Sequence, residues 1–251
     1  MRLSVAQFSY AGERASNQDA LGYHLDDDYA CFIVSDGVGG RAAGGAAARI
    51  VVDSISQSFA DERCTSEKAL QGYLHKAHRL LLEQSGDEPQ GMSSTVVALF
   101  IDRIAGRAAW GHAGDSRLYF YRRGRLRSTT RDHSLAQHFA GQAPLADTPN
   151  MLYRVLGGPA DEANASISEP LPLEDGDAFL LCTDGFWQHV PPAVLERSLR
   201  LAGSPNEWMA IQRLRLESLT PRPADNYSAL AVWVGEPQQV TLLALTERDC
   251  P

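Results

Sequence analysis

The sequence has few cysteines, no long hydrophobic run and no excess of positive charge. Its four cysteines are far apart and form no Cys-x-x-Cys pair, which argues against a zinc site or a disulfide scaffold. The formal net charge is −8, which argues against broad electrostatic binding to nucleic acid or to anionic membranes. A signal-peptide pattern and an apolar stretch of membrane-spanning length are both missing, so we expect a cytoplasmic protein without membrane insertion.

Three common site patterns are also missing. Several glycines gather between Gly37 and Gly45, but they match neither G-x-G-x-x-G nor G-x-x-x-x-G-K-[ST], so a nucleotide-binding loop is not indicated. The Gly114-Asp115-Ser116 sequence does not continue into G-x-S-x-G, the pattern of a nucleophile elbow. His75 and His78 are three residues apart in a helical pattern and could bind a metal, although most such histidines are exposed on a helix surface.

Short β-type runs that end in acidic or glycine residues recur along the chain. Two of them, 30–34 and 178–182, are hydrophobic throughout and lead into Asp36-Gly37 and Asp184-Gly185. Both are interpreted as buried strands that place an aspartate at a strand end.

Other segments predict further strands and several helices. Strands are predicted at 4–8, 94–101, 108–113, 118–121 and 227–234. Apolar residues three and four apart predict helices over 47–59 and 70–81, and Ser204-Pro205-Asn206-Glu207 is typical of a helix start. A short helix is expected after Ser134. Because helix pairs flank groups of strands, the pattern predicts layered α and β elements rather than a parallel βαβ sheet.

Aspartates recur at the ends of these strands or in their turns. They are Asp19, Asp36, Asp115, Asp184 and Asp225. A single Asp-Gly after an apolar run is more often only a turn. The repetition favours a shared site, because converging carboxylates are the ligands that Mg²⁺ and Mn²⁺ prefer.

Short motifs at these positions follow a fixed order along the chain. They are Arg14–Asp19, Asp36–Gly40, Gly114–Arg117, Asp132–Ser134, Asp184–Gly185 and Asp225–Ser228. In these motifs the sequence resembles the type 2C metal-dependent Ser/Thr protein phosphatases, in their compact bacterial form. The resemblance implies an α+β fold, a four-layer α-β-β-α sandwich with two central, mainly antiparallel sheets flanked by helix pairs. It also implies a catalytic domain over 1–235 with a flap at about 134–172, and leaves a tail at 236–251 without an assigned role.

The resemblance further implies hydrolysis of phosphoserine and phosphothreonine by direct attack of a water or hydroxide that bridges two Mn²⁺ or Mg²⁺ ions. Asp36 would bridge the two ions, while Asp184 and Asp225 would complete the first site. The carbonyl of Gly37 would bind the second ion. A third ion, as in bacterial relatives, would be held by Asp115 together with Asp184.

Two side chains would act beside the metals, and two positions depart from the family pattern. Arg14 would bind phosphate oxygens, because its planar guanidinium suits two-point contact with a tetrahedral anion. Asp19 would hold a metal-bound water. Gln18 replaces the glutamate of many relatives and could reach a metal through its amide oxygen or a water, so we expect weaker binding of the second ion. Val38 replaces a histidine proposed as general acid in eukaryotic relatives, and metal-bound water is the hypothesised substitute.

Two alternatives come from other classes of protein. A catalytically silent member of this fold could bind phosphoproteins as a regulatory module; intact Asp36, Asp184 and Asp225 count against it, while Gln18 leaves room for it. A metal-dependent phosphodiesterase or nuclease is disfavoured by the negative net charge.

We expect a monomer that acts on phosphoproteins in bacterial signalling and has no nucleic-acid partner. Its expected partners include a Ser/Thr kinase or the targets of that kinase and, by analogy, type VI secretion control.

Overall fold

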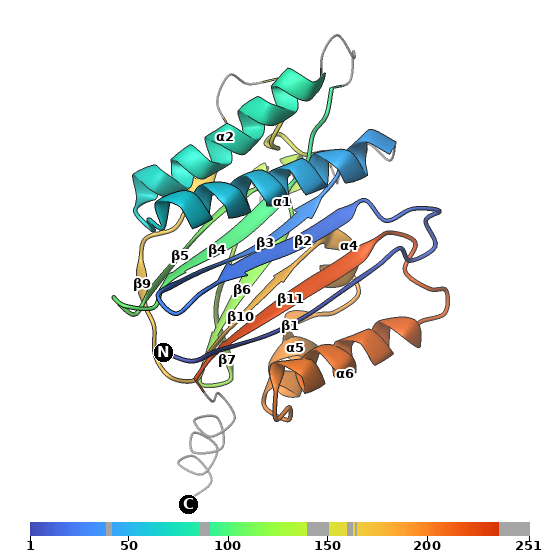
Figure 1. The fold of residues 1–251 in the computed structure, drawn as a ribbon. Coiled ribbons are helices and arrows are strands. Elements are labelled where there is room, and N and C mark those ends of the chain that lie inside the picture. Colours follow the sequence, from blue (N-terminus) through green and yellow to red (C-terminus); the bar gives the residue numbers. More distant parts are fainter. Residues whose placement is uncertain (39–41, 86–90, 140–150, 160–162, 164, 236–251) are drawn as a thin grey trace, which may run out of the picture.

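The computed structural model describes residues 1–38, 42–85, 91–139, 151–159, 163 and 165–235. Figure 1 shows two β-sheets packed face to face, with one pair of helices on each outer face. This arrangement confirms the predicted four-layer α-β-β-α sandwich. The tail at 236–251, the glycines at 39 and 40 and the 140–150 part of the expected flap lie outside the described residues.

Both sheets are antiparallel. The five-stranded sheet has the order β1-β11-β10-β6-β7, with β1 at Leu3–Tyr10, β11 at Tyr227–Val234, β10 at Asp177–Cys182, β6 at Arg117–Arg122 and β7 at Arg125–Thr129. The six-stranded sheet has the order β2-β3-β4-β5-β8, with β2 at Asp19–Leu25, β3 at Tyr29–Asp36, β4 at Val96–Asp102, β5 at Arg107–Ala113 and β8 at Ser166–Ile167. A short β9, Leu171–Pro172, also pairs with β5.

Two long helices cover the six-stranded sheet, and two shorter helices cover the five-stranded sheet (Figure 1). The first pair is α1, Ala42–Glu62, and α2, Glu67–Ser85; the second is α5, Pro192–Leu199, and α6, Pro205–Glu217. Two single-turn helices, α3 at Leu135–His138 and α4 at Asp184–Trp187, are additional to these pairs. The start of α6 is as predicted, because Ser204 Oγ accepts a hydrogen bond from Glu207 N at 3.1 Å.

Three hydrophobic clusters hold the layers together. The middle cluster lies between the sheets, where Phe120 and Phe179 stack with ring centroids 5.0 Å apart and face Phe32 and Leu99. The two outer clusters join each sheet to its helices. Because β3, β4, β10 and β11 are covered on both faces, their sequences are hydrophobic throughout rather than alternating.

The structure differs from the sequence-based prediction at β2 and at one helical histidine. The β2 strand was not predicted, because Gly22 interrupts its hydrophobic pattern. Helix α1 requires that glycine, since a Cβ atom there would lie 2.3 Å from Val52 Cγ1. The expectation of exposed histidines on α2 is correct for His75 and wrong for His78, which is fully buried and accepts a hydrogen bond from Gly157 N at 3.0 Å.

The region between 134 and 172 contains regular structure at both of its ends. The expected short helix after Ser134 is present as α3, and its N-cap Ser134 accepts a hydrogen bond from Gln137 N at 3.3 Å. At the other end, β8 and β9 extend the edge of the six-stranded sheet.

Within the described part of the chain, no helix has the length and apolar character needed to cross a membrane.

Candidate functional site

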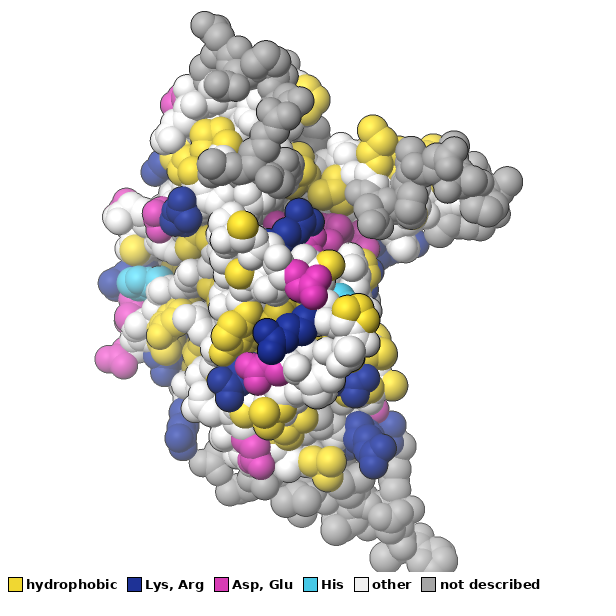
Figure 2. Space-filling view, turned by 90° about the vertical axis from the view of Figure 1, so that its right-hand side faces the viewer, with side chains coloured by type: hydrophobic (Ala, Val, Ile, Leu, Met, Phe, Trp, Pro, Cys, Tyr) yellow, Lys and Arg dark blue, Asp and Glu magenta, His cyan; other side chains and the backbone are white. Residues whose placement is uncertain are grey.

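The strand ends that carry the aspartates meet at one end of the sandwich. They surround a cavity of about 170 Å³. Its lining residues are Arg14, Gln18, Asp36, Gly37, Val38, Thr95, Asp115, Leu152, Asp184, Asp225 and Asn226. Figure 2 views the molecule from the right-hand side of Figure 1, and acidic side chains lie beside basic ones over the middle of that face. The structure therefore brings together every predicted site residue except Asp19, which lies directly behind this lining.

Asp36 is the last residue of β3, and its backbone is fixed on both sides. Its N–H donates a 3.0 Å hydrogen bond to Thr95 Oγ1, and its carbonyl accepts hydrogen bonds from Thr95 N at 2.8 Å and from Ser94 Oγ at 2.7 Å. In the sheet register Asp36 is the direct partner of Asp19. Burial, followed by the charges of Asp19 and Asp184, raises the pKa of Asp36 well above its usual range.

Asp19 begins β2 and is held by hydroxyl groups from the other sheet. Its Oδ2 accepts hydrogen bonds from Thr183 Oγ1 at 2.9 Å and from Ser228 Oγ at 2.6 Å. Its Oδ1 is buried and has no partner among the described residues. Burial raises the pKa of Asp19 to about 7, although the two hydroxyl groups act in the opposite direction.

Asp184 is placed by the turn between β10 and α4, one residue after Thr183. Its Oδ2 accepts a hydrogen bond from Gln188 Nε2 at 3.0 Å, while Oδ1 is buried without a partner in the described structure. Burial and the nearby charge of Asp225 raise the pKa of Asp184, while the backbone N–H of Gly185 and a side-chain interaction with Asp36 lower it in part.

Asp225 and Arg14 form the exposed side of the cavity. Arg14 Nη2 lies 3.0 Å from Asp225 Oδ2, and about half of the Arg14 side chain is exposed. The next residue, Asn226, fixes the segment that carries Arg14: its Nδ2 donates to the carbonyls of Ala11 and Ser16, and its Oδ1 accepts from Gln18 N at 2.9 Å. The predicted phosphate-binding arginine therefore already lies beside a predicted metal ligand.

Gly37 follows Asp36 and allows a close approach to the start of α1. A Cβ atom on Gly37 would lie 2.1 Å from the carbonyl oxygen of Gly44, so no other residue fits without movement of the backbone. Gly37 N donates a 3.2 Å hydrogen bond to the carbonyl of Gln18. These contacts bring Gln18 to the cavity next to Gly37, as the motif spacing predicted.

Asp115 lies in the turn between β5 and β6, and two large side chains support it. Trp187 Nε1 donates a 2.8 Å hydrogen bond to the Asp115 carbonyl. The Arg117 guanidinium lies 3.5 Å from the centroid of the Trp187 ring and makes two hydrogen bonds, of 2.8 and 2.7 Å, to Asp132. Burial and the charge of Asp184 raise the pKa of Asp115 to about 7.

The chemistry of this cluster fits divalent cations. The buried carboxylates raise one another's pKa values, which indicates that too little positive charge lies near them. Two of their oxygens, Asp19 Oδ1 and Asp184 Oδ1, have no partner among the described residues. Hard cations supply that charge and bind such oxygens. No group of three or more His, Cys, Asp or Glu side chains in the described ranges is close enough to hold an ion as it stands.

Several residues that build this site have no role predicted from the sequence. They are Thr95, Thr183, Trp187, Gln188, Asn226 and Ser228. Thr183 directly precedes Asp184, and Asn226 and Ser228 belong to the last motif, so their positions carried a signal. Thr95 and Trp187 are found only when β4 and α4 are packed against the cavity.

Comparisons with known proteins identify one family of phosphatases as similar to this chain. The family model Protein phosphatase 2C matches residues 9–215. The serine/threonine phosphatase stp of Listeria monocytogenes serotype 4b is 29% identical over 203 residues, which cover 74% of this chain and 79% of that relative.

Two solved structures extend the comparison to the fold. PppA, a key regulatory component of T6SS in Pseudomonas aeruginosa, is 28% identical, with a TM-score of 0.76 over 93% of this chain and 98% of that one. The catalytic domain of the phosphatase PstP, solved with two manganese ions, is 24% identical, with a TM-score of 0.78 over 93% and 99% of the two chains. These matches confirm the sandwich architecture.

Proposed function

The chain belongs to the protein phosphatase 2C family, and on this basis we propose that it removes phosphate from phosphoserine and phosphothreonine in proteins. The observation that carries the proposal is the convergence of Asp36, Asp184 and Asp225 with Arg14 in one small cavity. A silent phosphoprotein-binding module is not favoured, because the relatives that match over most of the chain are named phosphatases.

The proposed metal ligands are Asp36, shared between two ions, with Asp184 and Asp225 at the first and the Gly37 carbonyl at the second. Asp115 with Asp184 is the proposed third site, and Gln18 would act through its amide oxygen or a water. Bound there, Mn²⁺ or Mg²⁺ would offset the charge of the carboxylates and the phosphoryl group and would acidify a water molecule. PstP was solved in complex with two manganese ions, which supports a divalent metal cofactor for this chain.

The protein side chains would position the phosphoryl group and the attacking water. Arg14 can contact phosphoryl oxygens while it remains beside Asp225, because its guanidinium has several N–H groups and only one contacts that carboxylate. Asp19 has Oδ2 occupied by Thr183 and Ser228, so its Oδ1 is the oxygen left to orient a water or to take its proton.

The size of the cavity limits what can enter it. A volume of about 170 Å³ accommodates a phosphoryl group and cations but not a folded polypeptide. The substrate chain would lie outside, against the rim that includes Val38 and Leu152. Val38 is 38% exposed and offers no proton, so the leaving oxygen would take its proton from water in the cavity.

Hydrolysis of p-nitrophenyl phosphate and of a phosphothreonine peptide tests the proposal. We expect turnover that depends on added Mn²⁺ and is lost in Asp184→Asn. Absence of turnover by the wild-type protein at any metal concentration would favour the silent module instead. Activity on nucleic acid without activity on the phosphopeptide would favour a nuclease.

The proposal extends to the cellular role. PppA regulates T6SS in its own organism, and we propose that this chain likewise acts on a Ser/Thr kinase or its targets, as a monomer in the cytoplasm. Residues 1–235 would form the catalytic domain, with recognition by the region at about 134–172. Comparison of phosphoproteins in deletion and wild-type cells tests this role.

A further inference from the structure

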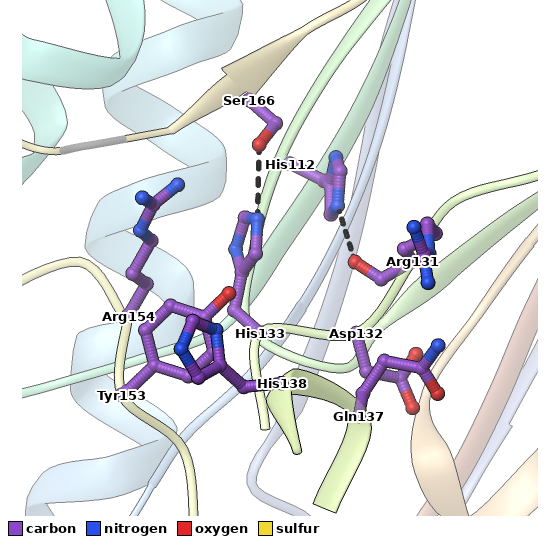
Figure 3. A pocket seen from close by; sticks show the side chains of 9 residues that line it. All are labelled: His112, Arg131, Asp132, His133, Gln137, His138, Tyr153, Arg154 and Ser166. Carbon is purple, nitrogen blue, oxygen red and sulfur yellow. Dashed lines mark hydrogen bonds between the residues drawn. The ribbon is translucent and has the colours of Figure 1, made fainter. Parts of the chain in front are cut away.

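A second cavity, of about 430 Å³, lies beside the candidate active site. Figure 3 shows Arg154 and Arg131 on opposite sides of the His133 ring, with Tyr153 and His138 below it. The remaining lining residues are His112, Asp132, Gln137 and Ser166. This cavity is larger than the one that holds the aspartates, and the proposed reaction does not use it.

The wall of this second cavity is positively charged although the whole chain carries a net charge of −8. Its carboxylate, Asp132, is already neutralised by two hydrogen bonds from Arg117. Arg131 and Arg154 are exposed, and neither forms an ion pair with any residue that the structure describes. The Arg154 guanidinium carbon lies 5.4 Å from the centroid of the Tyr153 ring. Two guanidinium groups are therefore available to an anion.

Neutral hydrogen-bond donors complete the wall. His133 Nδ1 accepts from Gly114 N at 3.3 Å, so the ring proton is on Nε2, which donates to Ser166 Oγ at 2.9 Å. Ser166 Oγ accepts this bond and has no acceptor for its own hydrogen among the described residues, so that hydrogen is available to a ligand. The Gln137 carboxamide likewise has no partner within the described ranges. Guanidinium, hydroxyl and amide donors on one cavity are suited to the oxygens of a phosphoryl group.

The two cavities share a wall, so one substrate segment could reach both. Leu152 lines the first cavity, and Tyr153 and Arg154, the next two residues, line the second. Tyr153 N donates a 2.9 Å hydrogen bond to the His133 carbonyl. This bond holds the 152–154 segment in the wall between the two cavities. Leu152 and Arg154 are at most roughly 7 Å apart along the chain. An extended peptide advances about 3.3 Å per residue, so about two to four residues span this distance together with the widths of the cavities.

We propose that this second cavity is an accessory site for a second phosphoryl group on the same substrate segment, about two to four residues from the phosphoresidue being hydrolysed. The inference rests on the proposed function and adds a substrate class to it: segments phosphorylated at neighbouring positions. Arg154 is the main ligand, and Arg131, Ser166 and Gln137 contribute further donors.

Phosphothreonine peptides test the proposal. One set carries a single phosphothreonine, and a second set carries another phosphothreonine two, three or four residues away on either side. We expect the wild-type protein to hydrolyse the best doubly phosphorylated peptide with kcat/KM about tenfold above its singly phosphorylated form. This ratio should fall to near one in Arg154→Gln and remain partly above one in Arg154→Lys, which keeps the charge but loses the planar fork.

Arg197→Gln is the matched control, because Arg197 is an exposed arginine on α5 outside both cavities, and it should retain the wild-type ratio. A ratio of one in the wild-type protein, or a ratio unchanged in Arg154→Gln, would overturn the proposal. Binding of inorganic phosphate that is lost in Arg154→Gln, without any preference among peptides, would assign the cavity to free phosphate and also overturn it. Wild-type turnover of p-nitrophenyl phosphate separates these results from a failure of the proposed function.

Discussion

Thr183 Oγ1 donates a 2.9 Å hydrogen bond to Asp19 Oδ2, and this contact joins the end of the five-stranded sheet to the end of the six-stranded sheet. The same hydroxyl oxygen accepts a hydrogen bond from Ser228 N at 3.0 Å. Thr183 therefore connects β10, β11 and β2 behind the candidate metal ligands.

Replacement of Thr183 by valine keeps the shape of the side chain and removes both of these hydrogen bonds. We expect Thr183→Val to lower the free energy of unfolding by about 1–3 kcal/mol, because a buried carboxyl group and a buried N–H lose a partner. Urea unfolding measures this change. Thr129→Val, at an exposed position on β7, is the control and should have little effect. Equal stability of the two variants would contradict the role given to Thr183.

Replacement of Asp184 by asparagine should change stability in opposite ways with and without metal. Without metal, we expect Asp184→Asn to raise the melting temperature, because the substitution removes one charge from a cluster of like charges. With Mn²⁺, we expect the affinity for the ion to be about tenfold or more below that of the wild-type protein. The rise in melting temperature on adding Mn²⁺ should therefore be much smaller in the variant. Differential scanning calorimetry with chelator and with Mn²⁺ measures both effects.

Asp53→Asn serves as the control for this comparison, since Asp53 is exposed on α1 and outside the cavity. It should leave both melting temperatures close to those of the wild-type protein. If the metal-free Asp184→Asn variant melted at a lower temperature than the metal-free wild-type protein, the Asp184 charge would have to be compensated by other groups of the protein, contrary to this prediction.

The raised pKa values of Asp19 and Asp115 predict how the metal-free protein responds to pH. Both pKa values are about 7 in the folded protein, against an ordinary value of 3.8. Between these values the folded state binds more protons than the unfolded state, so stability decreases as pH rises from about 4 to about 7. Thermal melting in chelator across this range measures the trend, and Asp115→Asn should make it shallower. Constant or rising stability over this range would be the contrary result.

Gln18 offers a substitution that should strengthen metal binding. Gln18→Glu adds a carboxylate beside the Gly37 carbonyl, and we expect the affinity for the second ion to increase by about tenfold. Isothermal titration with Mn²⁺ measures this directly, and the metal concentration needed for half-maximal turnover should fall in parallel. Gln57→Glu on α1, outside the cavity, is the control. An unchanged affinity would mean that position 18 does not act on the second ion.

Much of the fold could be predicted from the sequence, because burial on both faces leaves a simple pattern. The runs at 30–34 and 178–182 are parts of β3 and β10, and the predicted aspartates do follow them. The β2 strand could not be found in this way, since Gly22 is set by its contact with Val52 on α1 rather than by strand propensity. Strands of two residues, such as β8, depend on tertiary pairing with β5 and leave no periodic signal.

The charged residues of the candidate site can be predicted from the sequence, whereas the side chains that hold them in place cannot. Asp36 and Asp184 could be recognised because each follows a hydrophobic strand. Thr95 could not, because its role depends on β4 lying next to β3, so that its hydroxyl meets Asp36 N. Arg117 belongs to a motif, but its contact with the Trp187 ring depends on how α4 packs.

The aspartates of the cavity come from both sheets: Asp36 ends β3 in one sheet, and Asp184 follows β10 in the other. An ion held by both residues would act as a removable cross-link at one end of the sandwich, far from the stacked Phe120 and Phe179 in its middle. Metal depletion would then loosen this end while the middle stayed closed. Hydrogen exchange at the ends of β3 and β10 would rise before exchange in the strand centres, and the supply of metal ions would control local rigidity as well as turnover.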